Sequence, residues 1–178
     1  MAVDIIFETH STSEDNERGI ATGWLPGALS VRGREQAREL GARRRCDPIA
    51  AVFTSDLRRA VETAQLAFAG STIRISTDWR LRECNYGRLN GMPVARLEME
   101  RSRRIDTPFP DGESYRQVTA RMRSFLEDLA SEWAGAQVLL IGHTATRFAL
   151  QHLLEDTPLE RIVDAPFAWQ PGWQYRLA

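Results

Sequence analysis

Residues 4–10 read Asp-Ile-Ile-Phe-Glu-Thr-His, and residues 138–143 read Val-Leu-Leu-Ile-Gly-His. Each stretch is a short apolar run that predicts a buried strand, and each ends on a histidine. The second run is apolar almost throughout, as expected for a strand at the centre of a parallel sheet that is covered on both faces. Open α/β sheets bind ligands at the carboxyl ends of their strands. The two stretches therefore predict an α/β fold in which His10 and His143 share one site.

Strand and helix patterns alternate along the rest of the chain. Further strands are predicted at residues 50–54, 73–77 and 173–177. A helix capped by Ser30 carries Val31, Ala37, Leu40 and Gly41 on one face, and other helices are predicted from Ser55, over 113–134 and after His143. This order implies a three-layer α/β/α sandwich with a mostly parallel central sheet.

The chain length predicts a single domain over residues 1–178. From about residue 82 to residue 112 the regular pattern fades into arginine-rich and proline-bearing sequence. We expect this segment to form a lid-like excursion over the active-site edge of the sheet.

Composition narrows the class of protein. The net charge of −1 predicts no bulk attraction to nucleic acid or to a membrane. There is no apolar run of membrane-spanning length and no signal-peptide pattern, so we expect a cytoplasmic protein. All 23 basic residues are arginine, which we interpret as the codon bias of a GC-rich bacterial genome. Any anion site must then use arginine, histidine or backbone N–H groups.

Four segments at or just beyond predicted strand ends hold side chains suited to phosphoryl transfer through a histidine. Together they contain a nucleophile, cationic groups that stabilise a transferring phosphoryl group, and an acid for the leaving oxygen. There is no carboxylate cluster typical of a magnesium site and no glycine-rich nucleotide loop, so we expect chemistry without a metal or cofactor. The segments are Thr9–Ser13 with Asn16, Ser55–Ala64, Leu81–Glu83 and Gly142–Thr144.

In this order, and over nearly the whole chain, the segments resemble the histidine phosphatase superfamily, the phosphoglycerate-mutase-like group. The most specific likeness is at Thr54–Ala64, which reads Thr-Ser-Asp-Leu-Arg-Arg-Ala-Val-Glu-Thr-Ala. Residues 30–37 are similar to the family's first-helix segment, and Pro110–Ser114 resembles its Pro-Gly-Gly-Glu-Ser element.

The resemblance implies a role for each of four residues. His10 becomes phosphohistidine, Arg59 and His143 bind and polarise the phosphoryl group, and Glu83 acts first as proton donor and then as base for water. His10 must attack as a neutral imidazole, so its other ring nitrogen needs a hydrogen-bond acceptor. The positions implied for substrate binding are Thr9, Ser13, Asn16, Tyr86 and Thr144.

One position departs from the family pattern. Relatives typically read Arg-His-Gly where this chain reads Thr9-His10-Ser11, so the first phosphate-binding arginine is absent. A charge-assisted arginine contact is stronger than a hydroxyl contact, and we expect weaker phosphate binding unless Arg18, Arg58 or Arg82 compensates. Glu8 adds a like charge beside any phosphate unless it is paired.

Three functions are compatible with these residues. A phosphatase acting on a small phosphorylated metabolite is favoured, as a cytoplasmic monomer or homodimer. A phosphoglycerate mutase is the alternative, since Tyr86 stands in a mutase-like segment and Arg103-Arg104 could mimic a substrate-binding arginine pair. Against the mutase, the segment from Arg104 to Glu113 is too short to hold the mutase insertion. A catalytically weakened protein that binds a phosphorylated ligand or a partner is the third. Trp24 and Trp79 are interpreted as wall or core residues.

Overall fold

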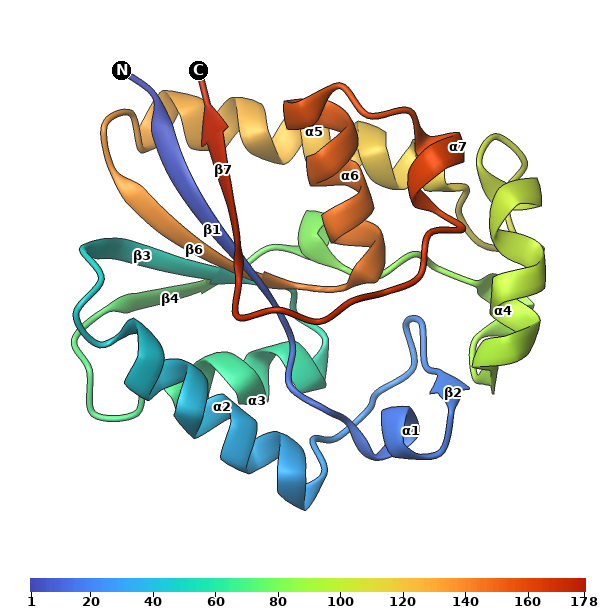
Figure 1. Cartoon of the computed structure of the whole chain (residues 1–178), viewed down its shortest axis with the longest axis horizontal. Coiled ribbons are helices and arrows are strands. Elements are labelled where there is room, and N and C mark those ends of the chain that lie inside the picture. The colour runs from blue at the N-terminus through green and yellow to red at the C-terminus, as the bar shows by residue number, and fades with distance from the viewer.

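The computed structural model describes residues 1–178. A five-stranded sheet in the order β4-β3-β6-β1-β7 lies at the centre of the molecule (Figure 1). The strands β1, β3, β4 and β6 are parallel, and β7 runs antiparallel to β1. The mostly parallel sheet that the sequence predicts is therefore confirmed. The strand bounds are β1 (Val3–Thr9), β3 (Ile49–Thr54), β4 (Arg74–Thr77), β6 (Gln137–Gly142) and β7 (Trp173–Leu177).

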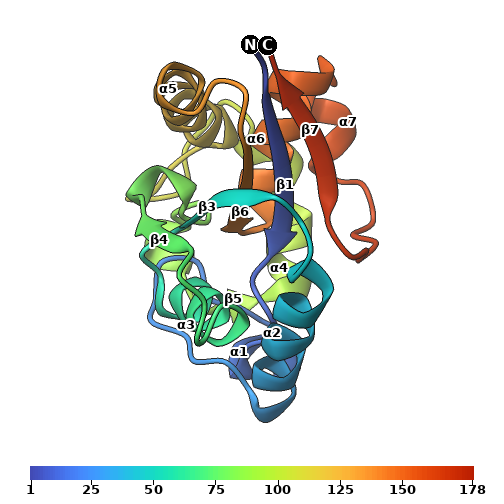
Figure 2. The same ribbon diagram turned by 90° about the vertical axis from the view of Figure 1, so that its left-hand side faces the viewer.

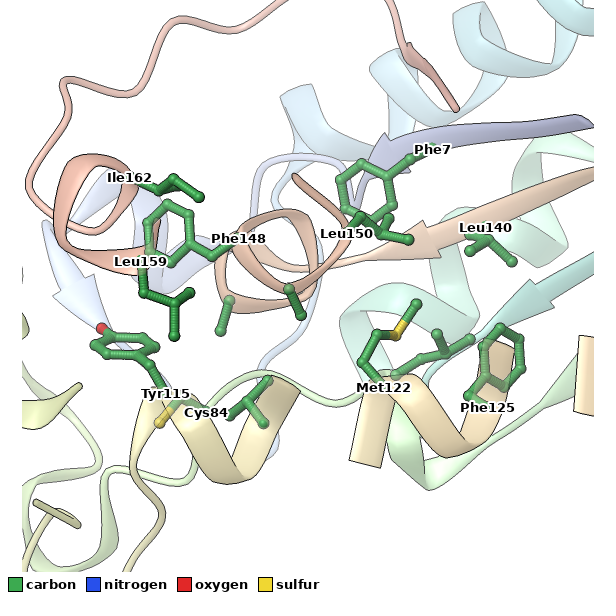
Figure 3. Close-up of a cluster of buried hydrophobic side chains, with 14 of the residues drawn as sticks. Phe7, Cys84, Tyr115, Met122, Phe125, Leu140, Phe148, Leu150, Leu159 and Ile162 are labelled. Atoms are coloured by element: carbon green, nitrogen blue, oxygen red, sulfur yellow. The ribbon is translucent and has the colours of Figure 1, made fainter. Parts of the chain in front are cut away.

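Helices cover both faces of this sheet (Figures 1 and 2). On one face, α2 (Val31–Arg44) and α3 (Arg58–Ala67) bury a smaller cluster that includes Ile6, Val52 and Leu139. On the other, α5 (Tyr115–Glu132) and α6 (Thr144–Glu155) bury the larger core. Figure 3 shows Leu150 of α6 beside Phe7 of β1, in the same core cluster as Met122 and Phe125 of α5 and Leu140 of β6. The three-layer arrangement follows from strands that are apolar on both sides.

Two excursions extend from the carboxyl edge of the sheet. The segment after β1 contains α1 (Glu14–Glu17) and β2 (Ile20–Ala21), where the sequence predicted only a loop. The segment from residue 82 to residue 112 contains β5 (Met92–Pro93) and α4 (Val94–Glu100), followed by a 3-10 helix over Arg101–Arg104. Strands β2 and β5 pair antiparallel, so the two excursions support each other.

Three predictions about individual residues are wrong. The helix predicted from Ser55 begins at Arg58, because the Ser55 side chain is engaged with His143 and does not cap the helix. Val31 is 69% exposed, because the buried face of α2 runs through Gly33, Ala37 and Leu40 and Val31 lies on another side of the helix. Trp79 is half exposed on a 3-10 helix (Trp79–Leu81) and contributes little to the core.

No helix in the structure has both the length and the apolar character needed to cross a bilayer.

Candidate active site

Sheet register brings the two strand-end histidines together. Strands β1 and β6 are neighbours, and Thr9 is paired with Gly142, so the next residue on each strand is a histidine. The His10 backbone N–H donates to the Gly142 carbonyl at 2.9 Å, and the two imidazole centroids lie 5.0 Å apart. The proximity that the sequence predicted follows from this register.

Hydrogen bonds define the His10 tautomer. His10 Nδ1 lies 2.8 Å from the Ser11 carbonyl oxygen, which can only accept, so Nδ1 carries the proton. Nε2 is then the unprotonated nitrogen, and it accepts a hydrogen bond from the Arg59 Nε–H at 3.3 Å. Burial, followed by the Arg59 charge, lowers the pKa of His10 from 6.5 to about 3. His10 is therefore a neutral imidazole at pH 7, as a nucleophile requires.

Arg59 lies between the two histidines. It is 2% exposed on the first turn of α3 and donates through Nη2 to His143 Nδ1 at 3.3 Å and to the Gly23 carbonyl at 2.8 Å. Gly23 has a φ of 56°, and a side chain there would collide with Asn90, so this turn requires glycine. The Gly23 carbonyl thus fixes the plane of the guanidinium beside His10 Nε2.

His143 is fully buried, and its tautomer is the reverse of that of His10. Arg59 can only donate, so Nδ1 of His143 accepts, and Nε2 donates to Ser55 Oγ at 2.7 Å. Burial lowers the pKa of His143 well below its ordinary value, and the Arg59 charge adds to this effect. Ser55 was not predicted as a site residue. Its position at the carboxyl end of β3, beside β6, is the signal that could have identified it.

Glu83 is buried at the cavity wall and is held by backbone groups. Its Oε1 accepts from the Cys84 N–H at 2.7 Å and from the Ala145 N–H at 3.1 Å. Ala145 lies in the first turn of α6, so Glu83 accepts from one of the N–H groups that a helix leaves without an intrahelical partner. Because both hydrogen bonds go to Oε1, Oε2 is the oxygen available for proton transfer.

Residues that the sequence did not mark as site residues fix the Glu83 backbone. Trp24 Nε1 and Arg121 Nη2 donate to the Glu83 carbonyl oxygen at 2.6 Å and 3.0 Å. Arg121 is in turn paired with Glu113, the glutamate of the Pro110–Ser114 motif. That motif therefore acts at a distance, by holding the segment that carries Glu83. Trp24 is half-buried and belongs neither to the cavity lining nor to the core, so its interpretation as a wall or core residue is wrong.

These groups lie at the base of a cavity of about 1150 Å³. Four of the five predicted substrate-binding residues line it, namely Thr9, Asn16, Tyr86 and Thr144. Ser13 does not line the cavity, because its hydroxyl accepts from the Asn16 N–H as the N-cap of α1. No group of three or more histidine, cysteine, aspartate or glutamate side chains is placed so that it could hold a metal ion.

The surroundings of Thr9 differ from the sequence expectation. Arg18, Arg58 and Arg82 do not line the cavity, and Arg82 is held in a two-pronged pair with Asp56. Arg32, Arg43 and Arg101 line it instead. Glu8 is buried and paired with Arg43 at 3.1 Å and with Arg44 at 2.7 Å. Its charge is therefore compensated, which removes the expected repulsion of a phosphate.

Comparison with known proteins identifies relatives over most of the chain. Residues 5–169 match the family model described as the histidine phosphatase superfamily, branch 1. A protein of Hydrogenobacter thermophilus named putative phosphoserine phosphatase 2 is 32% identical over 161 residues, which cover 86% of this chain and 79% of that protein. Other relatives are named phosphoglycerate mutases.

Solved structures with the same architecture include two bacterial proteins. YhfR of Bacillus stearothermophilus superposes with a TM-score of 0.85 at 25% identity, covering 95% of this chain and 88% of that one. A mycobacterial glucosyl-3-phosphoglycerate phosphatase superposes with a TM-score of 0.77 at 29% identity, covering 90% of this chain and 83% of that one. The matches thus include named phosphatases in both sequence and structure.

Proposed function

Because the chain belongs to the histidine phosphatase superfamily, we propose that it hydrolyses a small phosphorylated metabolite through a phosphohistidine on His10. The relatives named phosphatases support hydrolysis as the reaction. The observation that carries the proposal is the His10 tautomer: Nδ1–H is held by the Ser11 carbonyl, so Nε2 is unprotonated and lies beside the Arg59 guanidinium, which would bind a phosphoryl group. The reaction needs neither a metal nor a cofactor.

In the first half-reaction, His10 Nε2 attacks the phosphorus atom of the substrate. The bond between phosphorus and the ester oxygen breaks, and its electron pair goes to that oxygen. Glu83 donates a proton from Oε2 to the departing oxygen, which leaves as the alcohol.

In the second half-reaction, water attacks the phosphorus atom of phosphohistidine. The carboxylate of Glu83 takes a proton from the water, the P–N bond breaks, and its electron pair returns to Nε2. Inorganic phosphate leaves, and both residues regain their starting protonation states. His10 is then again a neutral imidazole with its proton on Nδ1.

Arg59 and His143 stabilise the phosphoryl group in transfer. Arg59 already donates toward both histidines, so its N–H groups lie where equatorial phosphoryl oxygens would come close to His10. The protein fixes these donors before substrate binds, which is the arrangement that stabilises a charged transition state most strongly. His143 donates from Nε2 to Ser55. In its other tautomer the proton would be on Nδ1, and Nδ1 could then donate to the phosphoryl group.

The mutase alternative has less support at this site. Arg103 is exposed, and Arg104 is paired with Glu100 and donates to the Pro108 carbonyl. Neither arginine lines the cavity, so they do not form the expected substrate-binding pair.

The proposed substrate is therefore a small phosphorylated metabolite, encountered in the cytoplasm. Homodimer formation stays a prediction, which sedimentation equilibrium would test.

Trapping of the covalent intermediate tests the proposal. The wild-type protein is mixed with radiolabelled phenyl phosphate and quenched in alkali, and we expect bound label that is stable to base and labile to acid. His10→Asn should carry no label. His152→Asn is the matched control, since His152 lies on α6 outside the cavity with its Nδ1 held by the Thr157 carbonyl. No label and no turnover across a panel of phosphomonoesters would contradict the proposal and favour a binding protein.

A further inference from the structure

Three large apolar side chains that the fold leaves exposed line the same cavity as His10. Met99 is 69% exposed, Phe167 45% and Trp169 62%. Exposed apolar side chains that gather at one cavity mark binding surfaces more often than single exposed ones do. The three residues come from two segments far apart in the chain, α4 and the stretch between α7 (Leu159–Ile162) and β7.

The stretch between α7 and β7 runs along the carboxyl edge of the sheet, as Figure 1 shows. Asp164, Ala165 and Pro166 of this stretch line the cavity together with Phe167 and Trp169. On the other segment, Val94 and Leu97 of α4 continue the apolar lining from Met99 toward the interior. The cavity wall is thus apolar on parts of both segments.

Side chains from the two faces of the sheet hold this stretch in place. The Arg147 guanidinium of α6 lies 5.7 Å from the Phe167 ring centroid and 5.3 Å from that of Trp173. Nearer β7, Arg44 of α2 donates to the Pro171 carbonyl at 2.9 Å while it pairs with Glu8. These contacts at Phe167 and Pro171 fix the path of the stretch, so its aromatic residues form a defined surface.

The cavity has room for an occupant larger than phosphate. Its volume of about 1150 Å³ lies slightly above the range of about 300–1,000 Å³ typical of pockets for small organic ligands. The groups around His10 account only for the phosphoryl end. The part of a phosphomonoester that departs with the ester oxygen must lie in the remaining space.

We propose that Met99, Phe167 and Trp169 form an apolar subsite for the leaving group, so that the substrates are phosphomonoesters of alcohols with a bulky apolar or aromatic part. The inference rests on the proposed phosphatase function and extends it to a substrate class. An apolar leaving group that enters the subsite covers these three side chains, and removal of their surface from water favours its binding. A small polar ester such as phosphoserine would leave that surface exposed.

A series of primary alkyl phosphates tests the subsite, because their alcohols leave with similar intrinsic ease. We expect kcat/KM to rise from ethyl to hexyl to phenylpropyl phosphate, by about tenfold or more over the series, as burial of several carbon atoms predicts. Phosphoserine should be turned over no better than ethyl phosphate. Equal values for ethyl and phenylpropyl phosphate would overturn the subsite but not the phosphatase, whereas no turnover of any ester would contradict the phosphatase itself.

Substitution locates the effect. The double variant Phe167→Ser/Trp169→Ser should lower the phenylpropyl-to-ethyl ratio of kcat/KM toward one, mainly through KM for the apolar ester. Trp79→Ser is the matched control, since Trp79 is a half-exposed tryptophan outside the cavity, and its ratio should equal that of the wild type. A ratio unchanged in the double variant would overturn the assignment. So would concentration-dependent self-association that the double variant abolishes, because it would assign the surface to a second copy of the chain.

Discussion

The base and the mouth of the cavity are built in opposite ways. We define the base as His10, Arg59, Glu83 and His143, and the mouth as Met99, Phe167 and Trp169. Every side chain of the base is buried or nearly so and makes at least two hydrogen bonds. The mouth is exposed, and only Phe167 is held by a neighbouring guanidinium. The comparison suggests a division of labour, in which the proposed chemistry depends on buried, hydrogen-bonded groups and the proposed selectivity depends on exposed apolar ones.

The end of β1 connects the two regions. Thr9 lines the cavity next to His10. Glu8, one residue earlier, forms ion pairs with Arg43 and Arg44 of α2. Because Arg44 also donates to Pro171, the residue two positions before the proposed nucleophile is linked to the stretch that carries the mouth. Changes at the base, at the link and at Thr9 should therefore differ in kind and in size.

The largest effect is expected at the base. Arg59→Met removes the N–H groups directed at the phosphoryl site and should lower kcat/KM for phenyl phosphate by about 100-fold to 1000-fold. Arg58→Met is the matched control, because Arg58 is the adjacent, exposed residue paired with Glu62, and its activity should stay near that of the wild type. If both variants lose activity equally, the comparison between a fixed base and its surroundings fails.

A smaller effect is expected at the link. Glu8→Gln leaves Arg43 and Arg44 without their buried carboxylate and should lower the free energy of unfolding in urea by about 2 kcal/mol. This loss is smaller than for fully buried ion pairs, because Arg43 is partly exposed. Limited proteolysis should also cut the 164–172 stretch faster. Asp47→Asn removes the more exposed partner of Arg44 and should change the free energy of unfolding by less than about 1 kcal/mol. Equal destabilisation by the two variants would contradict the role of Glu8.

The smallest effect is expected at Thr9. Thr9→Arg supplies a charge-assisted donor beside His10 and should raise kcat/KM for phenyl phosphate by about tenfold. Thr9→Gln, which adds length without charge, should give no such rise. Unchanged or lower activity of Thr9→Arg would mean that the arginines at the cavity wall, Arg32, Arg43 and Arg101, already supply the missing charge.

The sequence predicted the fold correctly where a segment has a clear apolar pattern and a recognisable residue at its end. The strands that end at His10 and His143, the Ser30 cap of α2 and the two layers of helices follow from patterns that tertiary contacts do not override. Ser13 shows a limit of motif reasoning. Its position suggested a phosphate ligand, yet a serine three residues before Asn16 is also a capping pattern, and the structure uses it as one.

The mouth of the cavity could not be predicted. Residues 164–172 show no helical or strand periodicity, and their path depends on Arg147 and Arg44, which come from helices on opposite faces of the sheet. The partners of Ser55 and Glu8 are likewise distant in sequence, at His143 and at Arg43-Arg44. Pairings of this kind arise only when the sheet has formed, so a single sequence carries no local signal for them.

The pairing of β1 with β6 also has a consequence for folding kinetics. The proposed nucleophile His10 and its partner His143 become neighbours only when strands separated by most of the chain have found their register. Such long-range pairing closes a large loop and slows folding relative to helix formation, which is local. Competence to form phosphohistidine should therefore return late during refolding, after most of the helical signal, and enzymatic activity would report completion of the central sheet.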